Sequence, residues 1–370
     1  MMGPAAPRLL RYLAPALLPL SLWAAGPPSL EEVRRAMAVP STEGLRGQQD
    51  GVGFAVTAAQ MAEVAAHSKE GPAPEGFGAK VRGAVLGAVC PHDDYLYAAR
   101  MYRAALAPIA AKTVVVVGVF HKWRAFGIRD RLIFDPYPAW RAPDGNVSVS
   151  PLREALLARL PEGDYVQDAA AHDAEHSVEP IVYWLRHENP GVEILPVLVP
   201  TMGFPRMEAL SDRFAAALAA VLKERGLRLG RDVQVVVSSD AVHYGADFDY
   251  APFGEGGPEA YVLARAQDRR LMREYLSGTV TKKKARGLFE KLVDPQDPVR
   301  YRIPWCGRFS VPFTMLVLRD LAGEGLLAAP AAYATSVDGP EPSYAEGPGR
   351  TAPSNLRHFV GYPAAWFCAP

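Results

Sequence analysis

The stretch Val85-Leu86-Gly87-Ala88-Val89-Cys90-Pro91-His92-Asp93-Asp94-Tyr95-Leu96-Tyr97 decides how the rest of the chain is interpreted. A short apolar run bounded by Gly and Pro is typical of a buried strand. This run ends abruptly in a cysteine, a histidine and two aspartates. Ligands of open α/β sheets bind just beyond the carboxyl ends of the strands. The stretch therefore predicts a strand that delivers polar side chains to a site.

Later segments place polar side chains in the same way. The apolar runs 113–119 and 233–239 are followed by His121 and Asp240, and Cys306 stands just before a predicted helix. The chain has only 8 histidines. Most of its metal-capable side chains thus lie at segment ends, where a shared site would be built.

Composition limits the classes of protein to consider. The 370 residues include 40 basic and 40 acidic side chains, so the formal net charge is zero. A nucleic-acid-binding surface usually shows a basic excess, and we therefore expect a small-molecule substrate and no nucleic acid. The three cysteines are too few for a disulfide framework. Their odd number leaves at least one thiol free or bound to a metal.

The first 26 residues have the layout of a secretory signal peptide. Arg8 and Arg11 precede an apolar run, residues 12–25, that ends in small residues. An uncleaved N-terminal anchor is the alternative. The run is shorter than the roughly 20 residues that a spanning helix needs, so no stable membrane span is expected. We expect an exported protein, periplasmic or extracellular.

We divide the remaining chain into a helical extension and linker, residues 27–80, and one domain, residues 81–370. Apolar runs of strand length alternate with helical patterns throughout the domain. This alternation predicts an α/β fold, layered, with a mostly parallel or mixed central sheet flanked by helices. The expected strands are 85–90, 113–119, 132–134, 192–199, 233–239, 331–337 and 358–367. The expected helices are 96–107, 151–159, 177–187, 205–225, 259–277, 281–292 and 309–321.

The loop 136–150 is long enough for a lid or a substrate rim. Its Tyr137, Trp140 and Arg141 would suit an aromatic or anionic ligand.

His92, His121 and Cys306 together make a plausible metal set. Two imidazoles and a thiolate leave a coordination position open for water or substrate. Nothing local in the sequence brings three such distant residues together, so separate structural roles in the core are the alternative.

Six ordered segments resemble the MEMO family, which is similar to the class III extradiol ring-cleaving dioxygenases of LigB-type fold. The resemblance spans Val81 to the C-terminus. The segments are Cys90-Pro91-His92-Asp93-Asp94-Tyr95-Leu96-Tyr97, Val117-Gly118-Val119-Phe120-His121, Glu175-His176-Ser177-Val178-Glu179, Ile194-Leu195-Pro196-Val197-Leu198-Val199, Ser238-Ser239-Asp240-Ala241-Val242-His243-Tyr244-Gly245 and Cys306-Gly307-Arg308.

The resemblance implies a metal centre held by His92, His121 and Cys306. The ion would be iron, with copper or zinc as alternatives. It also implies that His243 serves as the acid/base, held by Asp240. The other residues that it places in or beside the pocket are Asp93, Asp94, Tyr95, Lys122, Glu175, His176 and Arg308.

The chain departs from the family pattern at two places. Pro-His-Asp-Asp-Tyr replaces the usual Pro-His-Ala-Gly-Tyr, and Gly-Val-Phe-His-Lys replaces Gly-Pro-Ser-His-His. Three roles are open to Asp93 or Asp94: an added metal ligand, a partner that orients His92, or an ion-pair partner of Lys122. We favour the orienting role for one of them.

Other candidates are weaker. Cys90 shares a strand face with His92 and could form a disulfide with Cys306, but a small buried cysteine is the favoured interpretation. His172 and Asp173 precede a helix whose N-terminus the acid could cap. His187 and His358 are interpreted as surface or strand residues.

Three functions remain open at this stage. The first is a non-haem iron-dependent, dioxygenase-like oxidoreductase. The second is a non-catalytic metal-binding or scaffold protein. The third is a zinc-dependent hydrolase, because His₂Cys plus water suits zinc.

Overall fold

A computed structural model describes residues 26–70, 73–76, 83–339 and 342–370. The predicted signal peptide or anchor lies outside the described residues, apart from Gly26. Along the described part of the chain, no helix is both long and apolar enough to cross a bilayer.

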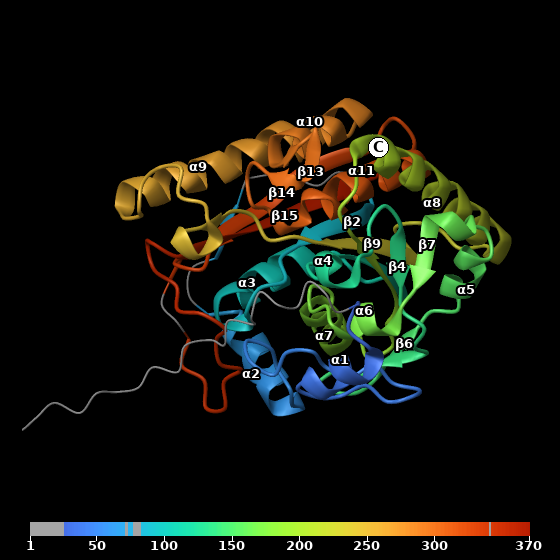
Figure 1. Cartoon of the computed structure of the whole chain (residues 1–370), viewed down its shortest axis with the longest axis horizontal. Coiled ribbons are helices and arrows are strands. Elements are labelled where there is room, and N and C mark those ends of the chain that lie inside the picture. Colours follow the sequence, from blue (N-terminus) through green and yellow to red (C-terminus); the bar gives the residue numbers. More distant parts are fainter. Residues whose placement is uncertain (1–25, 71–72, 77–82, 340–341) are drawn as a thin grey trace, which may run out of the picture.

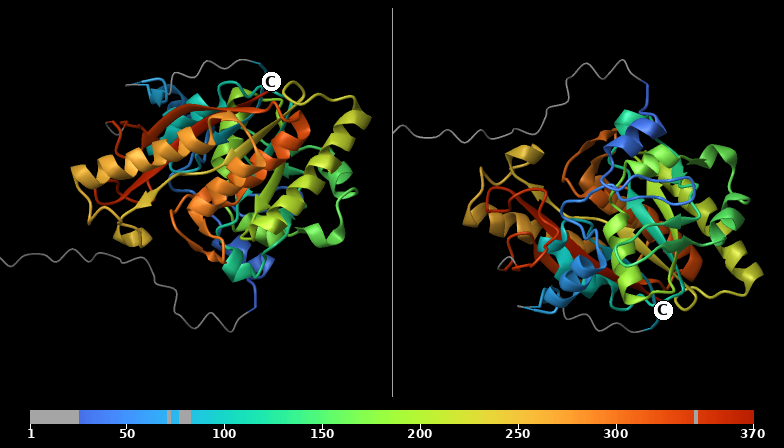
Figure 2. Two further views of the ribbon diagram at one scale, coloured as in Figure 1. Left: turned by 90° about the horizontal axis from the view of Figure 1, so that it is seen from above. Right: turned by 90° about the horizontal axis from the view of Figure 1, so that it is seen from below.

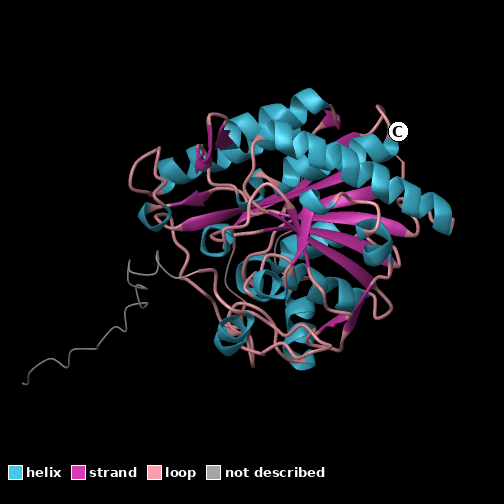
Figure 3. Ribbon diagram, turned by 45° about the vertical axis from the view of Figure 1, so that its right-hand side comes forward, coloured by secondary structure: helices cyan, strands magenta, loops and turns pink. Residues whose placement is uncertain are grey.

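Four parallel strands form the centre of the molecule (Figures 1 and 3). They lie in the order β2 (Val85–Cys90), β9 (Val233–Ser238), β3 (Thr113–Val119) and β8 (Glu193–Val199). Every residue of β3 and β9 is buried. Parallel strands covered on both faces are continuously apolar, which explains the valine runs.

Antiparallel strands extend the sheet on both sides, so the predicted mixed sheet is confirmed. On one side β15 (Phe359–Cys368) pairs with β2, and β14 (Leu327–Thr335) pairs with β15. On the other, β4 (Leu132–Phe134) is antiparallel to β8, and β7 (Tyr165–Gln167) is parallel to β4. Shorter strands join this sheet or form a separate pair: β1 (Glu75–Gly76), β5 (Ala139–Trp140), β6 (Val147–Val149), β10 (His243–Tyr244), β11 (Gly278–Thr279), and the pair β12 (Val293–Asp294) and β13 (Asp297–Tyr301).

Helices cover both faces of the sheet (Figure 2). Alternate side chains of one strand reach opposite cores: Val115 and Val117 pack in one, Val114 and Val116 in the other. Helices α5 (Leu152–Leu157), α8 (Phe204–Arg225), α10 (Lys282–Leu292) and α11 (Ser310–Ala322) bury apolar residues in the first core. Helices α1 (Leu30–Ala36), α2 (Ala58–His67), α3 (Tyr95–Leu106), α4 (Trp123–Phe126), α6 (Ala169–Asp173) and α7 (Glu179–Glu188) face the second. Helix α9 (Pro258–Tyr275) packs beside β14 and β15.

The predicted substrate rim at 136–150 is wrong. The segment folds into the β5–β6 hairpin, and Tyr137 and Trp140 are only 3% and 1% exposed. The Trp140 indole donates a hydrogen bond to the Asp135 carboxylate at 2.7 Å, and the Arg46 guanidinium lies over its ring. These aromatic side chains belong to the core because a large ring buries apolar area while its N–H finds a partner.

Candidate metal centre

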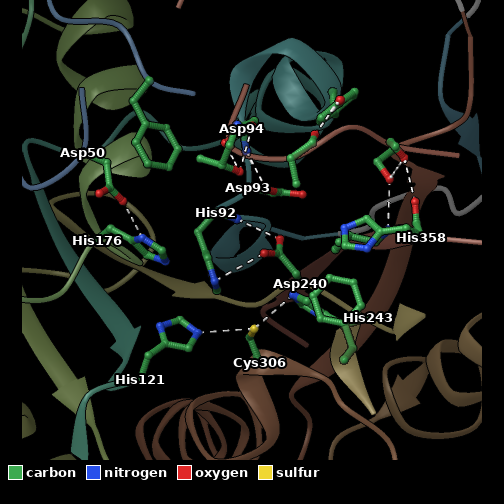
Figure 4. A pocket seen from close by; sticks show the side chains of 18 of the residues that line it. Asp50, His92, Asp93, Asp94, His121, His176, Asp240, His243, Cys306 and His358 are labelled. Carbon is green, nitrogen blue, oxygen red and sulfur yellow. Dashed lines mark hydrogen bonds and ion pairs between the residues drawn. The ribbon is translucent and has the colours of Figure 1, made fainter. Parts of the chain in front are cut away.

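The carboxyl ends of β2, β3 and β9 open into one cavity of about 470 Å³. Figure 4 shows side chains from these strand ends pointing toward one another. Nine of the predicted site residues line the cavity: His92, Asp93, Asp94, His121, Lys122, His176, Asp240, His243 and Cys306. Distant segments meet here because parallel strands end at the same edge of the sheet.

His92 follows β2 and is held by residues of β9 and the turn after it. Its main-chain N–H donates to Asp240 Oδ1 at 3.0 Å, and its Nδ1 lies 2.6 Å from Ser238 Oγ. The Ser238 hydroxyl donates to the Ser177 carbonyl, so it accepts from His92 Nδ1. His92 Nε2 thereby lies on the cavity side of the ring, next to Asp240.

Asp240 does not hold His243, contrary to the prediction. Its Oδ2 lies 3.3 Å from His92 Nε2, whereas His243 Nδ1 lies 3.1 Å from each of the Ala241 and Pro304 carbonyl oxygens. Asp240 and His243 are close in sequence, but their side chains contact different neighbours. Burial raises the pKa of Asp240 to about 6, although the nearby His92 opposes the rise.

His121 follows β3 and is fixed by Glu175. The Glu175 carboxylate accepts from the His121 main-chain N–H at 2.6 Å and lies 2.9 Å from its Nδ1. Burial disfavours a charged ring, but Glu175 and Cys306 outweigh it and raise the pKa of His121 to about 10. Burial also opposes the charge on Glu175, yet its His121 contacts hold the pKa of that carboxyl well below its usual range.

Cys306 lies between two imidazoles. Its Sγ is 3.4 Å from His121 Nε2 and 3.6 Å from His243 Nε2. Burial raises the pKa of a thiol, but the two rings outweigh this and hold the pKa of Cys306 well below its ordinary value. The thiolate form is the one that binds metals.

His176 is oriented by a residue that the sequence analysis missed. Its Nδ1 lies 2.7 Å from Asp50 Oδ2. Phe54, from the same N-terminal segment, packs edge-on against the His176 ring and lines the cavity. No motif or spacing marks Asp50 and Phe54, because only tertiary packing brings the segment 26–57 to the strand ends.

Arg46 attaches this N-terminal segment to the loop that carries Glu175 and His176. The side chain is fully buried, pairs with Glu179 and donates to the main-chain carbonyls of His172 and Glu175. The segment predicted as an extension and linker therefore forms part of the cavity wall.

Neither Asp93 nor Asp94 orients His92, so that prediction is wrong. Asp93 accepts from the Tyr362 hydroxyl at 2.6 Å and from the Asp94 main-chain N–H. Asp94 accepts from the Thr351 main-chain N–H at 2.6 Å and from its hydroxyl. The two carboxylates fasten the cavity wall to β15 and to the loop that precedes it.

Three further predicted residues lie away from the cavity surface. Tyr95 is buried and donates to the Pro180 carbonyl, and Glu175 stands behind His121. Arg308 donates to the Trp305 carbonyl, and its guanidinium lies over the Tyr301 ring.

The expectation that Asp173 caps a helix is also corrected, and the structure places His172 and His358. Asp173 caps no helix: it accepts from the hydroxyls of Ser41 and Tyr137. His172 is 1% exposed, and its Nε2 lies 3.0 Å from the Ile133 carbonyl oxygen. His358 lines the cavity and pairs with Asp247.

No disulfide joins Cys90 to Cys306. Both thiols are free, and Cys90 is fully buried in the core under α3. The interpretation of Cys90 as a small buried cysteine is confirmed.

Two sets of side chains in the described residues could hold a metal ion. One is His92, Asp240 and Cys306, and the other is His92, His121 and His176; within each set the donor atoms lie within 4.8 Å of one another. The predicted ligands are thus divided between two overlapping sets that share His92. Neutral imidazoles and a thiolate suit iron, copper or zinc.

The fold and this cavity define an α/β protein whose polar site lies at the carboxyl edge of a mixed sheet. A sequence model of the family described as Memo-like protein matches residues 57–344, and the chain belongs to this family. Asp50 and Phe54 precede the matched range.

Curated relatives agree with this assignment. A MEMO1 family protein of Pyrococcus furiosus is 28% identical over 218 residues, which cover 56% of this chain and 68% of the relative. One of Thermococcus kodakarensis is 28% identical over 245 residues, 65% of this chain and 76% of the relative. One of Pyrobaculum aerophilum is 31% identical over 170 residues, 45% and 56% respectively.

Proposed function

We propose that this protein is a non-haem iron-dependent oxidoreductase of the dioxygenase-like kind, with His92, His121 and Cys306 as the metal ligands. The observation that carries the proposal is the position of Cys306 Sγ, 3.4 Å from His121 Nε2 at the wall of a cavity. A sulfur held as thiolate beside two oriented imidazoles fits a transition-metal ion. A bound iron ion would supply redox chemistry with dioxygen.

His243 is suited to move a proton in this pocket. Its Nδ1 lies against two main-chain carbonyls, which fixes the ring, and leaves Nε2 to face Cys306 and the cavity. A general base must lie within hydrogen-bond reach of the proton that it takes. Burial lowers the pKa of His243, but the Cys306 thiolate outweighs burial and raises that pKa to about 10 in the metal-free pocket. A metal ion on the thiolate would neutralise its charge, and His243 would then accept the proton of a phenolic hydroxyl bound next to Cys306.

The cavity walls favour a small aromatic substrate. Phe54 and Phe248 contribute rings, and the Lys122 side chain contributes a cation at the rim. A volume of about 470 Å³ is in the range of small-molecule sites.

Oxygen uptake by iron-loaded protein tests the proposal. The protein is purified without oxygen, loaded with Fe²⁺ and offered a panel of catechols. We expect stoichiometric iron and catechol-dependent oxygen consumption in the wild type. Cys306→Ala should lose the iron, and His243→Gln should keep the iron but lose at least about 100-fold in rate.

Other results would replace the proposal. Zinc-dependent ester or amide hydrolysis without oxygen would identify a hydrolase. Stoichiometric metal with neither activity would favour a non-catalytic metal-binding or scaffold protein.

A further inference from the structure

Three imidazoles converge in the cavity, and Nε2 of one of them, His121, lies 3.4 Å from Cys306 Sγ. The ring centroids of His92, His121 and His176 lie 5.3, 5.3 and 5.9 Å apart, and one nitrogen of each lies within 4.8 Å of the others. Figure 4 shows the three rings, which come from three different segments, grouped between Asp50 and Cys306.

Each ring has its Nδ1 held by a different oxygen. Nδ1 of His92 lies 2.6 Å from Ser238 Oγ, that of His121 lies 2.9 Å from Glu175 Oε1, and that of His176 lies 2.7 Å from Asp50 Oδ2. Metal-binding histidines almost always have their second nitrogen held in this way by a carboxylate, a carbonyl or water. The shared arrangement leaves the three Nε2 atoms on the cavity side, where that of His92 lies 3.3 Å from Asp240 Oδ2 and that of His121 lies 3.4 Å from Cys306 Sγ. A metal ion held by the three rings would replace both contacts.

We propose that His92, His121 and His176 form an alternative metal position, one that shares His92 and His121 with the proposed iron site, takes Zn²⁺ or a similar divalent ion and does not use Cys306. The inference goes beyond the proposed function, because it needs neither the thiolate nor redox chemistry. Zn–N bonds of about 2.1 Å in a tetrahedral site place the nitrogens about 3.4 Å apart, so each ring would move inward by at most about 0.8 Å on binding.

Asp50 sets this position apart from the iron site. It lies in the N-terminal segment, before the range matched by the Memo-like family, and its contact with His176 is the carboxylate–histidine pair that raises ligand basicity. Loss of such a partner typically costs 10–100-fold in metal affinity. The segment 26–57 therefore does more than cover the core, since it supplies the carboxylate that holds one of the three ligands.

Co²⁺ binding to metal-free Cys306→Ser protein tests the proposal, because sulfur is then absent from the pocket. We expect one Co²⁺ per chain, with visible absorption and without the sulfur-to-cobalt charge-transfer band. Adding His176→Gln should weaken binding by at least about 100-fold, and adding Asp50→Asn by about 10-fold or more.

His187 and Asp144 provide the matched controls. His187 Nδ1 lies 2.9 Å from Asp144 Oδ2, the same kind of pair, and neither residue lines the cavity. His187→Gln and Asp144→Asn in the Cys306→Ser background should leave the Co²⁺ dissociation constant unchanged within about twofold, and circular dichroism checks that every variant folds.

Two results would overturn the inference: no Co²⁺ bound by folded Cys306→Ser protein, or equal dissociation constants for the His176→Gln variant and its His187→Gln control. The iron-dependent oxygen assay measures redox activity, whereas Co²⁺ binding to Cys306→Ser protein measures metal affinity without the thiolate. Its failure together with Cys306-independent Co²⁺ binding would reject the proposed function and leave this inference standing.

Discussion

Asp268 Oδ1 accepts a hydrogen bond from the Trp305 indole N–H at 2.7 Å, deep in the interior. The other oxygen of the same carboxylate accepts from the Tyr333 hydroxyl and from the Val242 main-chain N–H. Trp305 precedes Cys306, and Val242 precedes His243. One carboxylate on α9 thus ties together the two segments that carry the thiol and the proposed acid/base.

Replacing Asp268 should therefore destabilise the fold and loosen the site. Asp268→Ala leaves three buried donors without their acceptor, and each such loss costs about 1–3 kcal/mol. We expect the free energy of unfolding in urea to fall by at least about 3 kcal/mol, and by less in Asp268→Asn, which keeps one acceptor oxygen. Equal stability of Asp268→Ala and wild type would contradict the role assigned to this carboxylate.

Position 307 requires glycine because Ser239, which directly follows β9, lies very close to its backbone. A Cβ at this position would lie 2.3 Å from Ser239 Oγ and 2.4 Å from Ser239 Cβ. Overpacking of this kind costs about 1–3 kcal/mol, and here it also displaces Cys306. Gly307→Ala should lower both the stability and the metal content, whereas Gly163→Ala, with open space around its new Cβ, should change stability by less than about 0.5 kcal/mol.

Cys306 should be the reactive thiol of the metal-free protein. His243 and His121 hold the pKa of Cys306 low despite its burial, whereas burial raises the pKa of Cys90 and of Cys368. At pH 7, iodoacetamide should modify Cys306 at least about tenfold faster than the other two, as read by peptide mass spectrometry. His243→Gln should slow this reaction. Uniform labelling of all three cysteines would refute the prediction.

Acid should destabilise the protein through His172. Burial lowers the pKa of this ring to about 3, despite its contact with the Ile133 carbonyl. In the unfolded chain this histidine has a pKa near 6.5 and takes up a proton below that pH, whereas in the folded chain it stays neutral. The free energy of unfolding therefore falls as the pH drops from about 6.5 toward 3. The loss approaches about 1.4 kcal/mol per pH unit below about pH 5.5.

His172→Gln tests this pH dependence in metal-free protein. The glutamine amide can still donate to the Ile133 carbonyl but does not titrate in this range. Urea unfolding at pH 7, 6, 5 and 4.5 should show a shallower decline for the variant than for wild type or for His187→Gln. Parallel curves for all three proteins would exclude His172 as the cause.

The Arg46–Glu179 ion pair should have a large effect on the stability of the fold, because both side chains are fully buried. Removing one partner of a buried pair costs about 3–5 kcal/mol, since the other charge is left uncompensated. Arg46→Met should therefore be strongly destabilising, and Arg46→Met with Glu179→Gln should recover a substantial part of the loss. A double-mutant cycle measured by urea unfolding checks this, with additive losses as the contradicting result.

The sequence by itself determined the central sheet and which segments end at the site. The valine runs predict buried strands because a parallel strand covered on both faces must be apolar along its whole length. His92, His121, Asp240 and Cys306 follow or precede such segments, so their meeting at one edge follows from the topology. Periodicity also located most helices to within a few residues, as at 281–292, where the structure has α10 at Lys282–Leu292.

Only the tertiary structure decided which side chains face one another. The Asp240 carboxylate contacts His92 and not His243. Trp140 is buried in the core and does not line a substrate rim. The Asp50 carboxylate contacts the His176 ring although the two residues are 126 positions apart in the sequence. Such pairings depend on side-chain direction and on packing between segments distant in the chain, and neither strand periodicity nor motif spacing encodes these.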